Sequence, residues 1–285
     1  MKQEKFTNKK IYHYTKFENF EKIIKSKTLH FSELGKSNDS TEGNILLEDI
    51  KKDYPRLFKK YSNINKIKNK VFVGSFCCDK DNEFLWRKYA CDYTGFVIGF
   101  RIVRGLNNYK NISKIIPKFL SEVEYVKENV KYNNLNQEIC AWIKFFKRIK
   151  TDIEDNKEYL KFKKALIENI NNVILRYNDI IKFSSFEKEK ETRIIVSDIN
   201  DNLTEVENKT YYNFPIIEEF EKDVNKQNKI VVLPYKDFFH RVYFNEVIIG
   251  LKNNCDENTV RKILESSKYS VRIKVRKAGM KKILI

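Results

Sequence analysis

The sequence predicts an α+β fold in which a mostly antiparallel sheet is interrupted by helices. Short segments rich in β-branched and aromatic residues recur from residue 10 to residue 276, with short helical patterns between them. Residues 136–182 differ, because their apolar residues recur at helical spacing with neither Pro nor Gly. The length of 285 residues suits one large domain. We therefore expect a single domain, 1–285, carrying a helical insert at 136–182.

The first third of the chain predicts a strand, a helix and a second strand. The strands are expected at residues 10–15 and 29–32. Residues 16–26 lie between them, and their Phe and Ile residues fall on one helical face. A polar loop at 35–43 follows.

The middle of the chain predicts three strands around a compact helix. The strands are expected at 71–77, 95–102 and 122–126, and the helix at 81–91. Residues 95–102 carry few charges, so we expect this strand to be central.

The last third returns to strands. They are expected at residues 192–197, 229–233, 242–250 and 270–276, and a helix capped by an Asp is expected at 256–266. Residues 270–276 alternate apolar and basic side chains, which predicts one inward face and one basic solvent face.

Composition bounds the class of protein. With 56 Lys+Arg against 39 Asp+Glu, the net charge is +17, which attracts polyanions such as nucleic acid. The mixture of Lys, Asn and Ile is also typical of AT-rich coding, so a nucleic-acid partner and a coding bias both remain open. The chain has no apolar run of membrane-helix length and no signal-like start, so we expect a cytoplasmic protein without a membrane partner.

Common catalytic motifs are missing from the sequence. The five Cys residues form no C-x-x-C pair, so reduced thiols and no zinc site are expected. No dinucleotide fingerprint, phosphate-binding loop, H-E-x-x-H or G-x-S-x-G is present, which leaves Rossmann hydride transfer, P-loop hydrolysis and serine-esterase chemistry without support.

Two segments combine side chains that could act in catalysis. On a strand, His13 and Thr15 project from the same face and could hold a ribose diol, although a core histidine satisfied by hydrogen bonds also fits. The run from Glu187 to Arg193 places its acidic residues on one face if extended. Such runs are usually solvated, but Glu191 and Arg193 enter an apolar strand, where an unpaired charge is costly. We expect these two to form a buried pair or part of a working site.

Two further segments could bind ligand. Trp86 and Tyr89 are three residues apart on a predicted helix, so they could pack in the core or offer a platform for a flat ring. Asn38, Asp39 and Glu42 lie in the polar loop, where such residues also favour turns.

Several blocks in this order resemble the bacterial family of unknown function numbered 2971. They are Ile-Tyr-His-Tyr-Thr (11–15), Leu-His-Phe-Ser (29–32), Asn-Asp-x-x-Glu (38–42), Ser-Phe-Cys (75–77) with Asp-Asn (81–82), Leu-Trp-x-x-Tyr-Ala (85–90) and Gly-Phe-Val-Ile-Gly-Phe (95–100), Lys182 to Phe186 with Glu191 and Arg193, and Val-Ile-Ile-Gly-Leu (247–251). Phe186 stands where a Trp is usual in the family, and Ser40 where a Pro is common. The opening His-x-Thr strand and its helix are also similar to ADP-ribosyltransferase-like folds, including DNA-modifying toxins.

That second similarity implies roles for individual residues. His13 and Thr15, with Tyr14 between them, would bind the ribose of NAD, and Trp86 or Tyr89 would stack on nicotinamide. Glu191 would be the catalytic glutamate, with His13 beside it. Arg193 would neutralise the NAD pyrophosphate or pair with Glu191. Asn38, Asp39 and Glu42 would contact the substrate.

We therefore expect an NAD-dependent ADP-ribosyltransferase-like enzyme that acts in anti-phage defence or as a toxin. Nucleic acid is one candidate acceptor, and a defence or antitoxin protein is a candidate partner. Cleavage of the nicotinamide–ribose bond builds positive charge on the ribose, which a nearby carboxylate stabilises.

Two alternatives stay open at this point. In a metal-dependent nuclease, Asp39, Glu42, Glu189 and Glu191 could hold Mg²⁺. In a non-catalytic binding module, the basic face of Arg272, Lys274 and Arg276 would grip phosphates.

Overall fold

The computed structural model describes residues 8–34, 71–105, 118–127, 180–196, 203–216, 232–235 and 238–279. The chain divides into two compact units. The first comprises residues 1–33, 70–122 and 188–285, and the second residues 34–69 and 123–187.

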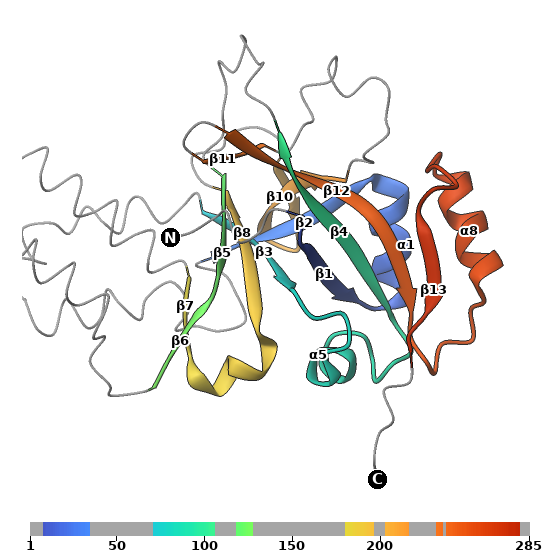
Figure 1. Ribbon diagram of the computed structural model, residues 1–285, viewed down its shortest axis with the longest axis horizontal. Helices are drawn as coiled ribbons and strands as arrows, with labels where there is room; N and C mark the ends of the chain where they lie inside the picture. The colour runs from blue at the N-terminus through green and yellow to red at the C-terminus, as the bar shows by residue number, and fades with distance from the viewer. Residues whose placement is uncertain are drawn as a thin grey trace, which may run out of the picture. The chain divides into compact units, whose positions relative to one another are not determined.

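The first unit is built on a large, mostly antiparallel sheet, which confirms the predicted α+β class (Figure 1). The described strands run in the order β11-β12-β4-β1-β3-β2-β10-β9, with β13 beside β12, β8 beside β3 and β5 beside β8. Their bounds are β1 Lys10–Thr15, β2 Thr28–Glu33, β3 Phe72–Cys77, β4 Phe96–Gly105, β5 Lys118–Glu122, β8 Glu191–Val196, β9 Leu203–Val206, β10 Lys209–Pro215, β11 Val232–Tyr235, β12 Phe238–Ile249 and β13 Lys274–Lys277. Among the described strands of this sheet, only β12 and β13 pair in parallel.

One face of the sheet carries the main core, which α1 (Phe17–Ser26) and α8 (Glu257–Ser266) join. Phe20 of α1 stacks on Phe96 of β4, with ring centroids 4.2 Å apart. The side chain of Asp256 accepts a hydrogen bond from the backbone N–H of Thr259 and caps α8 as predicted. We call this side of the sheet the core face.

The opposite face is covered in part by the short helix α5 (Glu83–Lys88), whose Leu85 and Trp86 pack on Tyr14, Val97 and Ile248. We call this side the α5 face. The predicted helix at 81–91 is therefore shorter than expected. It begins after Asn82, whose side chain accepts from the backbone N–H of Leu85. The central position of β4, between β1 and β12, is confirmed.

The second unit is described at Leu34 and at two short segments, 123–127 and 180–187. Strands β6 (Glu124–Val126) and β7 (Ile181–Phe183) pair in parallel. The start of the short 3-10 helix η4 (Ser184–Glu189) follows β7.

Three predicted elements need correction. The strand expected at 122–126 is two strands, β5 and β6, that join different neighbours. The predicted helical insert ends in a turn and a strand at 180–182 instead of a helix. Its other residues, 136–179, lie outside the described residues. The strand expected at 270–276 begins only at Lys274, and Val271 is exposed instead of inward.

The hairpin of β9 and β10 was not predicted, because polar residues interrupt its sequence and it lacks the apolar β-branched runs that marked the other strands. Within the described residues no helix is long and apolar enough to span a bilayer. The four described cysteines, Cys77, Cys78, Cys91 and Cys255, are free thiols.

Candidate functional site

One row of residues crosses five neighbouring strands on the α5 face. The strand pairings set Glu246 opposite Gly99, Gly99 opposite Tyr12, Tyr12 opposite Cys77 and Cys77 opposite Glu191. Directly opposed residues share a face of the sheet, so a buried glutamate stands at each end of this row. With strands about 4.8 Å apart, the two are about 19 Å from each other.

Glu191 is held between an arginine and a serine. The Arg193 guanidinium donates from Nε to Glu191 Oε1 at 2.9 Å and from an Nη to Oε2 at 3.3 Å. Ser75 Oγ donates to the same Oε1 at 2.6 Å. Glu191 is 4% exposed and Arg193 is not exposed, whereas Ser75 is exposed. The pairing of Glu191 with Arg193, one of the two alternatives predicted for Arg193, is therefore present.

Ser75 lies where the sheet forks. On one side β3 pairs with β8 along its whole length. On the other side it pairs with β2 at Phe72 and Val73 and with β1 at Cys77, so the described pairings skip Gly74 to Phe76. The imidazole of His13 meets β3 in this gap, with Nδ1 3.2 Å from the Ser75 carbonyl oxygen. His13 thus contacts a backbone carbonyl in the stretch of β3 that the described pairings leave open on the side of β1 and β2.

His13 and Glu191 approach Ser75 from different sides. His13 is opposite Ile98, a core-face residue, and its ring lies edge-on to Phe76 of the same face, with centroids 5.9 Å apart. Glu191 instead shares the α5 face with Cys77. Burial lowers the pKa of His13, so the imidazole is neutral at pH 7. The two predicted catalytic groups therefore meet through Ser75, at its carbonyl and at its hydroxyl.

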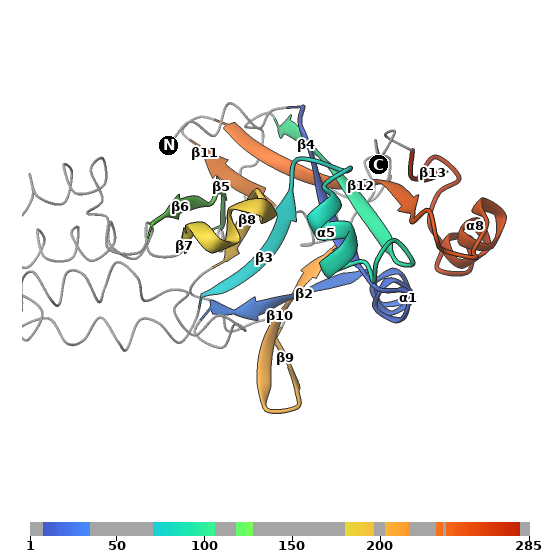
Figure 2. The same cartoon turned by 90° about the horizontal axis from the view of Figure 1, so that it is seen from below.

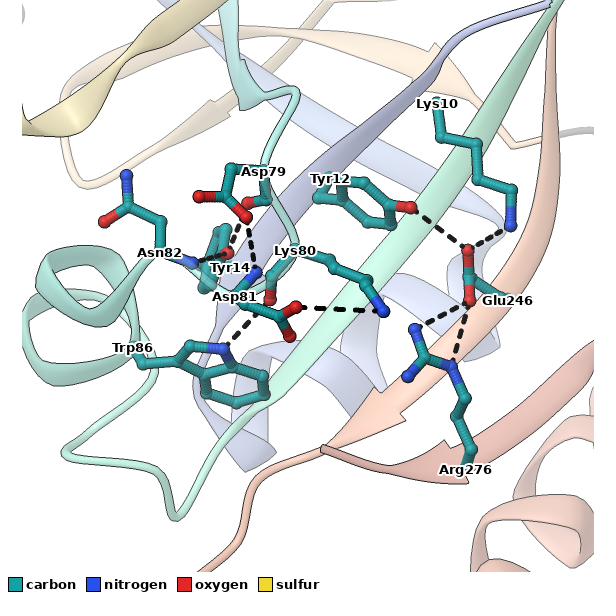
Figure 3. Close-up of polar contacts among 10 residues, drawn as sticks. All are labelled: Lys10, Tyr12, Tyr14, Asp79, Lys80, Asp81, Asn82, Trp86, Glu246 and Arg276. Carbon is teal, nitrogen blue, oxygen red and sulfur yellow. Dashed lines mark hydrogen bonds and ion pairs between the residues drawn. The ribbon is translucent and has the colours of Figure 1, made fainter. Parts of the chain in front are cut away.

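Tyr14 and Thr15 are both buried. Tyr14 Oη donates to the carbonyl of Asp79 at 2.6 Å and accepts from the backbone N–H of Asn82 at 3.2 Å, as Figure 3 shows. Burial raises the pKa of Tyr14, so its hydroxyl stays protonated. Tyr14 thus fixes the loop that leads from β3 into α5.

The predicted aromatic pair does not form one platform. Trp86 is 1% exposed, stacks on Tyr93 and donates from Nε1 to the Lys80 carbonyl at 3.0 Å (Figure 3). Tyr89 is 40% exposed and ends α5. Trp86 therefore packs in the core, and Tyr89 presents the only accessible ring of the two.

Tyr89 also ties α5 to the segment before Glu191. Its Oη donates to Glu189 Oε1 at 2.7 Å, and Lys88 Nζ donates to the same oxygen at 3.0 Å. Asn82 Nδ2 adds a bond to the Lys188 carbonyl at 3.0 Å. These contacts fix the chain immediately before β8.

The acidic run does not line one face as predicted. Glu187 and Glu189 belong to η4, and Lys190 has a φ of 45°. This left-handed residue separates the helix from β8, so Glu189 faces α5 while Glu191 joins the sheet.

Glu246, at the other end of the row, follows a bulge in β12 and is 2% exposed (Figure 3). It accepts from Lys10 Nζ at 2.5 Å, from Arg276 at 3.3 Å and from Tyr12 Oη at 3.4 Å. Burial acts to raise the pKa of Glu246, but the bond and charge of Lys10 and the charge of Arg276 outweigh it and hold that pKa below its ordinary value. Sequence reasoning missed this site, although a Glu inside the apolar segment 242–250 was a signal like that of Glu191.

The described residues offer no cluster of three or more metal-ligating side chains. Glu189 and Glu191, two of the residues predicted for Mg²⁺, each bond to a cationic side chain instead. The other two, Asp39 and Glu42, lie with Asn38 outside the described residues. Ser75, which belongs to the Ser-Phe-Cys block of the family resemblance but was given no role at the sequence level, is the site residue that joins His13 to Glu191.

Comparison with known proteins supports the resemblance over part of the chain. Residues 85–194 match the family model described as a protein of unknown function (DUF2971). This range contains Trp86, Tyr89, Glu191 and Arg193. No curated protein and no solved structure matches the chain.

Proposed function

We propose that this protein is an NAD-dependent ADP-ribosyltransferase-like enzyme whose catalytic carboxylate is Glu191. The observation that carries the proposal is a buried glutamate that accepts a hydrogen bond from an exposed hydroxyl, Ser75. A ribose hydroxyl presents the same donor, so a carboxylate oriented for Ser75 is also oriented for a sugar.

In the proposed reaction, the bond between nicotinamide and the ribose C1′ breaks, and nicotinamide leaves with the electron pair. A nucleophile of the acceptor, or water, forms the new bond to C1′ and releases its proton to solvent. Glu191 stabilises the positive charge that develops on the ribose, and its low exposure strengthens this effect.

Arg193 and Ser75 act as positioning residues. Arg193 contacts both carboxylate oxygens from the buried side and holds the Glu191 side chain in one orientation. Tyr89 supplies the accessible ring for nicotinamide. The similarity of the opening strand and helix to DNA-modifying toxins leads us to propose a defence effector or toxin.

The test is nicotinamide release from NAD by the full-length protein, with and without DNA or RNA. Glu191→Gln should lower the rate about 100-fold or more, since it removes a preorganised charge from the transition state. Glu246→Gln is the matched control, because it removes an equally buried, arginine-paired carboxylate and should keep the rate.

Thermal unfolding of both variants separates lost catalysis from lost folding. Ser75→Ala offers a milder change at the same site. No nicotinamide from the wild type with any acceptor, or equal losses in Glu191→Gln and Glu246→Gln, would contradict the proposal.

A further inference from the structure

The α5 face continues beyond Ser75 onto strands β2, β10 and β9, which lie side by side (Figure 2). The pairings place nine side chains on this part of the face, each exposed or half-buried. Thr28 and Pro215 lie at one end, and we call the other seven the hairpin strip: His30, Ser32, Thr204, Val206, Lys209, Tyr211 and Asn213. The alternate residues of the same strands, including Phe31 and Phe214, fill the core. The strip is therefore a surface formed by strand alternation.

An aromatic pair stands at the centre of the strip. The rings of His30 and Tyr211 are stacked, with centroids 5.4 Å apart and planes at 29°. His30 is exposed and Tyr211 half-buried. Neighbouring side chains still desolvate the exposed ring in part, which lowers the pKa of His30, so the ring is neutral at pH 7 and suits stacking.

Polar groups surround this pair. One amide N–H of Asn213 donates to Thr204 Oγ1 at 2.7 Å, which fixes the amide beside the rings. Lys209 is exposed on the same face of β10, two residues before Tyr211. Flat rings, a fixed amide and an ammonium group together match the base, base edge and phosphate of a nucleotide.

We propose that the hairpin strip binds single-stranded nucleic acid, with one base stacked on the His30–Tyr211 pair and a phosphate near Lys209. A single strand is favoured over a duplex because only an unstacked base exposes a face to these rings. The net charge of +17 supports a polyanionic ligand.

The position of the strip links this inference to the proposed function, on which its biological role rests. Tyr211 is opposite Ser32, and Ser32 is opposite Val73, two residues before Ser75 on β3. Two strand spacings correspond to about 10 Å. A strand bound on the strip would therefore bring a neighbouring nucleotide close to Ser75 and Glu191 as an acceptor.

The test is the affinity of the full-length protein, without NAD, for a short fluorescein-labelled oligodeoxythymidine, followed by fluorescence anisotropy. His30→Ala and Tyr211→Ala should each weaken binding about tenfold, the loss typical of a base-stacking side chain. Tyr211→Phe keeps a ring and should bind as the wild type does. Lys209→Gln should reduce the salt dependence by about 0.7 in the log–log slope.

The matched control for charge is Lys262→Gln, on the exposed side of α8, which should leave the affinity unchanged.

Because His30 is exposed, His30→Ala remains informative if Tyr211→Ala does not fold. Wild-type affinity in His30→Ala and Tyr211→Ala would overturn the proposal, and so would the absence of wild-type binding. Loss of NAD affinity with unchanged oligonucleotide affinity would also overturn it, since the pair would then hold the adenine of NAD. The anisotropy experiment does not depend on nicotinamide release, so nucleic-acid binding by the hairpin strip and NAD cleavage at Glu191 can each fail without the other.

Discussion

Glu191 and Glu246 end the same row of residues, and each is buried beside an arginine, but different groups separate them from solvent. Glu246 is enclosed by Lys10 and Arg276, whose side chains are half-exposed and form the outer layer. Glu191 has its arginine on the buried side and a neutral, exposed serine hydroxyl on the other. A carboxylate covered by cations is a structural ion pair, whereas one that accepts a hydrogen bond from an exposed neutral hydroxyl can exchange that hydroxyl for a ligand.

The largest difference should come from removing each arginine. Arg193→Met leaves Glu191 without its buried cation and should lower the free energy of unfolding by about 3–5 kcal/mol. Arg276→Met should cost about 1 kcal/mol or less, because Lys10 still pairs with Glu246 and Arg276 is half-exposed. Urea denaturation measures both, and equal costs would remove the distinction between the two sites.

Gly99 should matter next, since it makes room for Glu246. A Cβ at this position would lie 2.4 Å from Glu246 Cγ and 3.2 Å from Tyr12 Cε1. Gly99→Ala should therefore cost about 1–3 kcal/mol. A double-mutant cycle with Glu246→Ala checks the cause, and the cost should shrink in that background. An unchanged cost would mean that the strain lies elsewhere.

Removing the hydroxyl group that donates to each glutamate should change the free energy of unfolding by smaller amounts. Ser75 Oγ is 2.6 Å from Glu191, whereas Tyr12 Oη is 3.4 Å from Glu246. Ser75→Ala should lower the free energy of unfolding by about 1–2 kcal/mol, as for a bond to a charged group. Tyr12→Phe should change it by about 0.5 kcal/mol or less. Chemical denaturation of the two variants at one pH tests the ranking, and a larger loss for Tyr12→Phe would contradict it.

The smallest effect should be a pH dependence from His13. Because its folded pKa lies below the ordinary 6.5, the unfolded chain binds the proton more readily. Stability should therefore fall as the pH drops below about 6.5. For Glu246, whose pKa is also lowered, stability should be lost only as the pH falls below about 4.5. The free energy of unfolding of His13→Gln, measured by denaturation between about pH 5 and pH 8, should depend less on pH than that of the wild type.

Most strands could be predicted from the sequence, because runs of apolar and β-branched residues indicate buried segments and most strands of this sheet are buried. The sequence also predicted the pair of Glu191 and Arg193, since charges inside an apolar strand need partners. The contribution of Ser75 was not predictable, because it depends on where β1 and β2 diverge along β3. The separate directions of Glu189 and Glu191 were missed because one residue, Lys190, takes a left-handed conformation.

The row of opposed residues also limits how the chain can change in length. Adding or deleting one residue within β12, β4, β1, β3 or β8 reverses which side of the sheet the following side chains occupy. A glutamate moved in this way would meet the aliphatic interior without its cation. We expect single-residue insertions to be tolerated in the β9–β10 turn at Glu207–Asn208 and rejected in these five strands.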